Sequence, residues 1–157
     1  VTATYLQERA KHIICSDLSN TPVQPYEKEV IECVLGAFET PLGGICLKDI
    51  DQDKLFVEVE FHYLKEDGNM IKGLVDLIFQ VGNTFYIVDW KSNALPNYQE
   101  SNLIEAMKNH DYFLQEKLYS IFLKRYLKQK KDEALFGGTF YVFLRGLKQG
   151  LGVLFLP

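Results

Sequence analysis

The sequence contains few cysteines, and their number and spacing exclude two classes of protein. Cys15, Cys33 and Cys46 are its three cysteines, and none of them is spaced as C-x-x-C. An odd, widely spaced set argues against a disulfide framework and against a zinc or iron–sulfur site. We therefore expect buried or free thiols.

Long hydrophobic runs are also missing. No apolar stretch approaches the roughly eighteen residues that a membrane span requires, and the first four residues lack the basic and apolar regions of a signal peptide. We expect a cytoplasmic protein that does not contact a membrane. Because the chain begins with Val1 rather than Met and ends at Pro157 directly after an apparent strand, we interpret it as a fragment of a longer protein.

An excess of positive charge is absent as well, since the formal net charge is −4 at pH 7. This charge is a poor match for a protein that captures DNA by its own electrostatic field, so a DNA substrate would have to be delivered by another component. The composition is otherwise ordinary. The 157 residues, 47% hydrophobic and 24% charged, indicate one soluble domain with a single core.

The hydrophobic pattern changes from helical to strand-like after Pro41. Pro25 lies near the start of a predicted helix, where a missing N–H costs nothing. Two dipeptides that favour hairpin turns, Asp67-Gly68 and Gly82-Asn83, separate three apolar runs. Three antiparallel strands are therefore predicted, over residues 55–63, 71–79 and 84–90.

The last third of the chain predicts one covering helix and two further strands. Leu114, Leu118, Ile121 and Phe122 share one face of a predicted helix over residues 112–122, so we expect this face to cover one side of the sheet. Two more strands are predicted over residues 139–144 and 153–156. The order helix, three strands, helix and two strands indicates an α/β sandwich around a mixed sheet.

Three charged residues lie within or beside otherwise apolar strands. Every neighbour of Asp76 out to three positions is apolar or glycine, and a carboxylate in such a place is costly unless it is paired or bound to metal. Asp89 and Lys91 lie at the end of the next predicted strand, two positions apart, so their side chains share one face.

The turn between the two strands predicts how the carboxylates are arranged. If Gly82-Asn83 is a two-residue loop, Val81 pairs with Thr84, and counting outward brings Asp76 directly opposite Asp89. Two facing carboxylates repel each other in a bare sheet, but they are the ligands that a hard divalent cation needs. We favour a metal site. The alternative is a salt-bridged cluster of the two aspartates and the lysine at a sheet edge.

Several motifs in fixed order resemble the nuclease domain of the RecB family, in the PD-(D/E)XK nuclease superfamily. They are G-x-x-D at residues 73–76, D-x-K-S-N at 89–93, Q-x-x-x-Y at 115–119 and F-G-G-x-x-Y-x-F-L-R-G at 136–146. V-E-F at residues 59–61 resembles an upstream strand of the same family. The resemblance covers about residue 55 to the end of the chain. D-x-K alone would be weak evidence for the family, but the four motifs in this order are specific to it.

The resemblance implies a single nuclease domain over residues 1–157 with a PD-(D/E)XK, restriction-endonuclease-like core, in which helices flank a mixed central sheet. It implies Mg²⁺-dependent hydrolysis of DNA phosphodiesters, of the exodeoxyribonuclease V type, as a helicase feeds strands into the site during double-strand break repair and recombination. DNA, RecC-like and RecD-like subunits and a RecA-like recombinase are the implied partners.

The family's catalytic residues carry over to four positions. Asp76, Asp89 and the backbone carbonyl of Trp90 would hold Mg²⁺, which would lower the pKa of a bound water and neutralise developing charge. Lys91 would orient the attacking water or stabilise charge on the scissile phosphate.

Three further residues have implied supporting roles. Gln115 and Tyr119, four apart and so on one helical face, would position DNA or the catalytic strand. The role of Glu60 depends on the first hairpin, because a two-residue turn at Asp67-Gly68 turns it to the face opposite Asp76, whereas a loop with an odd residue count restores it. We keep Glu60 as an outer-shell ligand or water partner, or else an exposed strand residue.

The chain departs from the family in one respect. The family has a metal-binding histidine upstream, in a G-x-x-x-H context, and none of His12, His62 and His110 matches this context. We expect ordinary surface or partly buried histidines here and a ligand histidine outside this chain. We therefore predict weak metal affinity and little nuclease activity for the isolated fragment, and tight Mg²⁺ or Mn²⁺ binding in calorimetry would contradict this.

Two other functions remain open. One is a catalytically weak or inactive module that docks or regulates its partner subunit, and the other is a stand-alone restriction-type or repair nuclease. Retained Asp76, Asp89 and Lys91 favour an active nuclease over the first. The motif at residues 136–146 favours the recombination machinery over the second.

A basic run follows the predicted covering helix. Lys124, Arg125, Lys128, Lys130 and Lys131 are typical of a solvated helix end, where cations complement the helix dipole, and contact with a DNA backbone is the alternative. The numerous aromatic residues lie mostly in predicted strands, so we expect them to fill the core rather than stack on bases.

Overall fold

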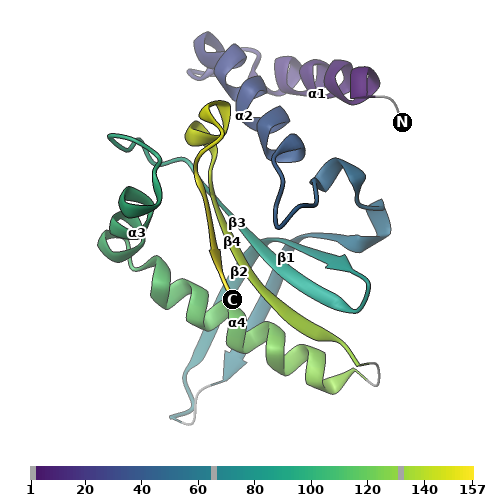
Figure 1. The fold of residues 1–157 in the computed structure, drawn as a ribbon, viewed down its shortest axis with the longest axis vertical. Helices are drawn as coiled ribbons and strands as arrows, with labels where there is room; N and C mark the ends of the chain where they lie inside the picture. The colour runs from purple at the N-terminus through teal and green to yellow at the C-terminus, as the bar shows by residue number, and fades with distance from the viewer. Residues whose placement is uncertain (1–2, 65–66, 131–132) are drawn as a thin grey trace.

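A five-stranded mixed sheet forms the centre of the molecule, with helices on both faces (Figure 1). The computed structural model describes residues 3–64, 67–130 and 133–157. The strands follow one another in the order β1-β2-β3-β4-β5, and only the β3–β4 pair is parallel. In chain order the elements are α1 (Ala3–Leu18), α2 (Glu27–Glu39), β1 (Leu55–Leu64), β2 (Met70–Val81), β3 (Thr84–Lys91), α3 (Glu100–Asn109), α4 (Tyr112–Gln129), β4 (Leu135–Phe143) and β5 (Val153–Leu156).

The hairpin between β2 and β3 has the turn that the sequence predicts. Val81 pairs with Thr84, and Gly82 has a φ of 57°, a left-handed conformation that glycine adopts without steric cost. Because this turn fixes the register of the whole hairpin, it also fixes which residues face each other at its far end.

The parallel β3–β4 pair requires a crossover connection, which α3 and α4 supply. The sequence predicted a single helix in this region. The structure has two helices, and Asp111 between them has a φ of 56°. Aspartate is among the few residues that tolerate this left-handed conformation, which interrupts helical hydrogen bonding.

Each face of the sheet has its own apolar cluster. On one face, α4 packs against β1, β2 and β3 (Figure 1), and on the other, α2 and the segment after it pack against β2, β3 and β4. A third cluster joins α3 to β4 and β5. Of the four residues predicted to form the covering face of α4, Phe122 packs against the apolar cluster on this face of the sheet. Leu114 is 59% exposed, and the side chains that α4 buries are Tyr119, Ser120, Leu123 and Leu127.

Two findings concern the chain as a whole. All three cysteines are free thiols. Among the described residues, no helix combines the length and the apolar character that crossing a membrane demands.

Candidate active site

The end of β3 carries two buried charges of opposite sign. The side chain of Asp89 is 2% exposed and that of Lys91 is 9% exposed, and the Lys91 ammonium contacts Oδ2 of Asp89. Both residues point to the α4 face, as their spacing of two predicts. β3 lies in the middle of the sheet, so both charges are held away from bulk water by the neighbouring strands and α4.

Asp76 lies at an irregularity in β2. The β1–β2 ladder omits the pair Glu58 and Asp76, and Glu58 has a φ of 53°, unusual for a residue with a side chain. Val75 and Ile78 pack in the same apolar cluster although they are three positions apart, so the strand exchanges its two faces across Asp76. Such an irregularity re-aims a side chain that a regular strand would hold in alternation.

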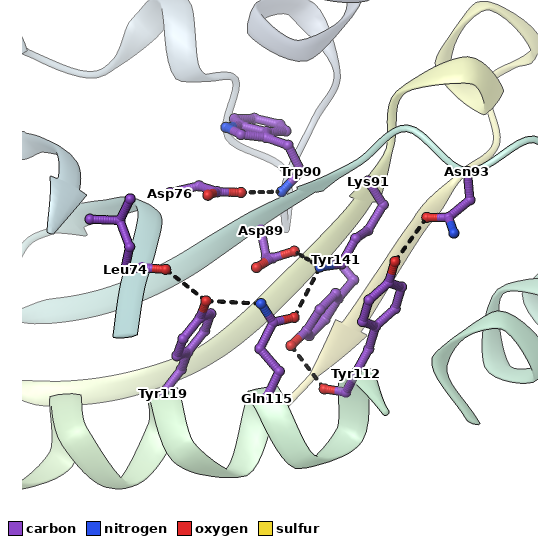
Figure 2. A network of polar contacts seen from close by, with 10 residues as sticks. All are labelled: Leu74, Asp76, Asp89, Trp90, Lys91, Asn93, Tyr112, Gln115, Tyr119 and Tyr141. Carbon is purple, nitrogen blue, oxygen red and sulfur yellow. Dashed lines mark hydrogen bonds and ion pairs between the residues drawn. The ribbon is translucent and has the colours of Figure 1, made fainter. Parts of the chain in front are cut away.

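The predicted register between β2 and β3 is confirmed as far as the ladder extends. Pairs run without a shift from the turn to Leu77 and Val88, one step before Asp76 and Asp89. Beyond this point Oδ2 of Asp76 accepts a hydrogen bond of 2.9 Å from the backbone N–H of Trp90 (Figure 2). The carboxylate thus takes the place that a strand carbonyl would occupy.

The first turns of α4 place two polar side chains beneath the buried charges (Figure 2). Nζ of Lys91 donates to Oε1 of Gln115 at 2.9 Å, and Nε2 of Gln115 donates to Oη of Tyr119 at 2.8 Å. The Tyr119 hydroxyl in turn donates to the backbone carbonyl of Leu74 at 2.7 Å. This chain of hydrogen bonds ties α4 to β2 and β3 and fixes the position of the Lys91 ammonium.

Sequence reasoning missed three residues around the lysine. Nζ of Lys91 lies 3.8 Å from the ring centroid of Tyr112 and 5.4 Å from that of Tyr141, within the range of cation–π contacts. The Tyr112 hydroxyl donates to Oδ1 of Asn93 at 3.3 Å. One signal was present, because Tyr112 precedes Gln115 by three positions and so shares its helical face.

The electrostatics of the site are dominated by burial. Burial raises the pKa of the Asp89 carboxyl to about 6, although the Lys91 ammonium opposes the shift, and the charge of Asp76 adds to it. Burial also raises the pKa values of Tyr119 and Tyr141 above their ordinary value. Both phenols therefore remain neutral hydrogen-bond donors at physiological pH.

Glu60 is not among the residues that the structure brings together. It pairs with Leu74 across the β1–β2 ladder, so the hairpin is not the two-residue turn at Asp67-Gly68. Its side chain is 48% exposed and forms ion pairs with Lys72 at 2.8 Å and His62 at 2.9 Å. The observed register is the one expected for a hairpin loop with an odd number of residues, which was predicted to bring Glu60 to the site. Glu60 is nevertheless separated from the site, because the strand irregularity at Asp76 changes which face of β2 each side chain points to.

The histidines lie elsewhere. His62 belongs to the Glu60 pair, His12 is exposed on α1, and His110 is exposed and stacks on Tyr112 with ring centroids 5.3 Å apart. Over the residues that the structure describes, no group of three or more histidine, cysteine or acidic side chains is placed to bind a metal. A cation here would have to use two carboxylates and the backbone.

The oxygen atoms at the end of β3 fit such a cation. Oδ2 of Asp89 is buried, and its contact among the described residues is the ion pair with the Lys91 ammonium. In a strand the carbonyl of a residue points to the same side as its own N–H, so the Trp90 carbonyl lies on the side of Asp76. Two carboxylates and a carbonyl form the all-oxygen set that Mg²⁺ prefers, with water completing the shell.

Comparison with known proteins identifies the family. The PD-(D/E)XK nuclease superfamily matches the chain over residues 3–153. Three similar proteins are RecBCD enzyme subunits RecB. The one from Chlamydia trachomatis is 32% identical over 138 residues, 83% of this chain and 13% of that protein. The one from Borreliella burgdorferi is 35% identical over 105 residues, 63% of this chain and 9% of that protein.

The third, from Escherichia coli strain K12, is 40% identical over 86 residues, 50% of this chain and 7% of that protein. The chain thus spans a small part of the length of each of these relatives. Its five-stranded mixed sheet flanked by helices is the fold that the resemblance implied. By this match over almost its whole length, the chain belongs to the PD-(D/E)XK nuclease superfamily.

Proposed function

We propose that this chain is the nuclease domain of a RecBCD-type helicase-nuclease, and that it hydrolyses DNA phosphodiesters with Mg²⁺ as its cofactor. The observation that carries the proposal is the juxtaposition of Asp76, Asp89 and Lys91 at the open end of the β2–β3 ladder. Similarity to RecB subunits supports the choice of DNA as substrate.

Asp76, Asp89 and the Trp90 carbonyl are the groups that would hold the ion. When bound, Mg²⁺ supplies Lewis acidity, which acidifies a coordinated water and neutralises charge on the phosphate. The hydrogen bond from the Trp90 N–H holds Oδ2 of Asp76. Asp89 contributes a buried carboxylate whose raised pKa reflects an unfavourable negative charge, so a cation beside it relieves that cost.

Lys91 places a positive charge where the phosphate must lie. Its ammonium is fixed by Asp89, by Gln115 and by the Tyr112 ring, so little reorganisation is needed when charge develops on the phosphoryl oxygens. Gln115 and Tyr119 are positioning residues in this scheme, because their hydrogen bonds act through the lysine.

The wider assignment concerns the assembly. We propose RecC-like and RecD-like subunits as partners, a cytoplasmic role in double-strand break repair and recombination, and cooperation with a RecA-like recombinase. A net charge of −4 fits a domain that receives its strand from a helicase rather than one that captures DNA alone.

Cleavage of a labelled single strand by the 157-residue chain tests the proposal. We expect slow, Mg²⁺- or Mn²⁺-dependent cleavage that Asp89→Asn and Lys91→Met each reduce by on the order of a hundredfold or more. Lys108→Met, on an exposed lysine of α3, is the matched control and should cut at the wild-type rate. Cleavage that survives Asp89→Asn overturns the assignment, and a wild-type chain that cuts no DNA with either metal favours a docking or regulatory module instead.

A further inference from the structure

A cavity of about 330 Å³ lies beside the candidate active site, between the edge of β1 and the C-terminal half of α4. It is on the same face of the sheet as Asp89 and Lys91. Aromatic rings from three elements line it, together with a lysine that follows α4. The principal lining residues are Phe56, Ile78, Phe85, Phe122, Tyr126 and Lys130, and we call this cavity the α4 groove.

A row of aromatic rings connects the site to the α4 groove. The ring of Phe61 meets Tyr119 edge-on with centroids 5.7 Å apart and stacks on Phe122 at 4.5 Å. Phe122 continues the row to Tyr126, at 6.3 Å. Since Tyr126 follows Tyr119 by seven residues of helix, the groove lies roughly 10 Å along α4 from the site.

Two rings of the groove are open to solvent. Tyr126 is 47% exposed and Phe56 is 39% exposed, whereas most of the strand aromatics are buried. Exposed aromatic surface inside a cavity is unfavourable in water unless a ligand covers it. Every DNA base has an apolar π-face of the kind that stacks on such rings.

Lys130 places a positive charge in the groove of a chain that is negative overall. Nζ of Lys130 lies 5.2 Å from the Tyr126 ring centroid and 5.8 Å from that of Phe85. Lys124, Arg125 and Lys128 also belong to the C-terminal half of α4 but do not line the groove. Among the described residues, none of these four cations has an acidic partner within ion-pair distance. Lys131, the fifth member of the basic run, lies outside the described residues.

One acidic residue reaches the cavity, and its charge is already matched. Glu60 lines the α4 groove, but its carboxylate is paired with Lys72 at 2.8 Å and His62 at 2.9 Å. The charge left unpaired in the groove is therefore positive. Aromatic faces beside the unpaired Lys130 ammonium match a nucleic-acid single strand, whereas an apolar protein segment offers no negative charge to that ammonium.

We propose that the α4 groove binds bases of an unpaired DNA strand about two or three nucleotides from the phosphate that is cleaved, at a stacked spacing of about 3.4 Å per nucleotide. Bases stack on Tyr126 and Phe56, and Lys130 contacts a backbone phosphate. The inference rests on the proposed function, because the bound strand is its substrate. It makes that substrate single-stranded, since a duplex offers no free base faces.

Binding of single-stranded oligonucleotides in EDTA, which prevents cleavage, tests the stacking contacts. The fluorescence of 2-aminopurine, placed at one position of the oligonucleotide, is quenched when that base stacks on an aromatic ring. We expect quenching at one or two adjacent positions, and roughly five- to tenfold weaker binding for Tyr126→Ala and Phe56→Ala with loss of the quenching. Tyr26→Ala, which removes a 61% exposed tyrosine beside α2, is the matched control and should bind and quench like wild type.

Salt dependence tests the phosphate contact. Lys130→Gln should lower the slope of log affinity against log salt by about 0.7, as expected for one contact to a single strand, and Lys108→Gln should leave the slope unchanged. Unaltered binding and quenching in Tyr126→Ala and Phe56→Ala overturn the proposal, as does equal sensitivity of blunt duplex to these substitutions. The proposal is also overturned if an apolar peptide binds the groove and single-stranded DNA does not displace it, because the groove would then bind a protein segment.

The two proposals fail in different ways. If the wild-type chain cuts DNA and the groove variants bind and cut like it, the groove assignment falls and the nuclease assignment stands. If the groove variants lose binding while neither wild type nor Asp89→Asn cuts DNA, the nuclease assignment falls.

Discussion

At the end of β3, Asp89 and Lys91 form an ion pair that is almost inaccessible to solvent. Replacing such a pair by well-packed apolar residues is often neutral or stabilising, whereas removing one partner costs about 3–5 kcal/mol. Stability therefore gives no reason to place charges at this point of an apolar strand. Phosphoryl chemistry does, because it needs metal ligands and a cation together.

The raised pKa of Asp89 predicts a pH dependence of stability in the metal-free chain. A carboxyl whose pKa rises from 3.8 to about 6 on folding binds more protons in the folded state, so its contribution to stability is present at low pH and is lost as pH rises toward and through 6. Relative to Asp89→Asn, the free energy of unfolding of wild type should fall by roughly 2 kcal/mol between pH 4 and pH 7.

Urea unfolding in EDTA at pH 4 and pH 7 measures this change. The comparison uses the change in unfolding free energy of each protein between the two pH values, so a constant difference in stability between wild type and Asp89→Asn does not affect it. A wild-type stability that falls no more than that of Asp89→Asn would mean that the carboxyl is not desolvated as its burial implies. Adding Mg²⁺ at pH 7 should restore part of the lost stability to wild type alone.

Tyr112 provides a second prediction at the residue scale. Its ring lies 3.8 Å from the Lys91 ammonium, and loss of a largely desolvated cation–π contact is worth about 1–2 kcal/mol. Tyr112→Leu should therefore lower kcat for strand cleavage about tenfold with little change in KM, because the residue positions the lysine rather than binding DNA.

Tyr112→Phe is the matched control, since it keeps the ring and removes only the hydrogen bond to Asn93. It should cleave within about twofold of wild type, because the lost hydrogen bond is long, at 3.3 Å, and does not involve Lys91. Equal losses in both variants would show that the hydroxyl, not the ring, holds the site together.

The sequence predicts the position of a site residue only where a local feature, such as a tight turn, determines its neighbours. The turn at Gly82 sets the register, so the pairing of β2 with β3 as far as Leu77 and Val88 followed from counting residues. Tyr112 and Asn93 could not be found in that way, because their contact joins residues 19 apart through the crossover. Its geometry depends on how α4 docks on the sheet.

At the scale of elements, the main surprise is the break in alternation within β2. A regular strand would place Val75 and Ile78 on opposite faces, yet both pack under α4. The single-sequence pattern showed only an apolar run, which fits either arrangement. At this break the Asp76 carboxylate accepts a hydrogen bond from the Trp90 N–H, so the irregularity places Asp76 next to the end of β3.

The F-G-G motif, which contributed to the family resemblance, has a packing role. A Cβ on Gly137 would lie 2.3 Å from the ring of Tyr86, and Gly138 has a φ of 130° at a shift in the β3–β4 register. Its two glycines therefore let β4 approach β3 closely, and Tyr141 of the same motif lies beside Lys91. The sequence located this strand correctly but could not reveal why glycine is needed there.

Gly73 gives a prediction for the packing of β2 against β1. A Cβ at this position would lie 2.4 Å from the ring of Phe61, which is 4% exposed and held between Tyr119 and Phe122. Gly73→Ala must displace that ring, and we expect a loss of roughly 1–3 kcal/mol in the free energy of unfolding.

Urea unfolding checks this loss against Lys72→Ala, an exposed neighbour on the same strand whose ion pair is worth less than about 1 kcal/mol. If Gly73→Ala proves no less stable than Lys72→Ala, the Phe61 ring has room that the structure does not show. The aromatic row between the site and the α4 groove would then be adaptable rather than fixed.

At the scale of the whole molecule, the acidic net charge and the local cations indicate that capture of DNA and contact with the bound strand are performed by different parts of the protein. A charge of −4 disfavours unaided capture of DNA, whereas the basic end of α4 offers contacts to a strand already brought close. The relatives are many times longer than the matched region, which fits delivery of the strand by other parts of such proteins.

The proposed set of metal ligands predicts weak affinity for Mg²⁺. Two carboxylates and a carbonyl beside an ammonium provide little net negative charge, so we expect a dissociation constant on the order of millimolar. Calorimetry with Mg²⁺ or Mn²⁺ should show this, with further weakening in Asp76→Asn. Glu60→Gln should bind like wild type, because that carboxylate is occupied by Lys72 and His62. Submicromolar binding would reveal a ligand that the described residues do not supply.

The most direct test of the account is the anomalous scattering of Mn²⁺ in a crystal of this chain. We predict one peak at about 2.1 Å from carboxylate oxygens of Asp76 and Asp89 and from the carbonyl oxygen of Trp90. A Mn²⁺ ion bound elsewhere, or the two carboxyl groups turned to different sides of the sheet with no ion between them, would contradict it.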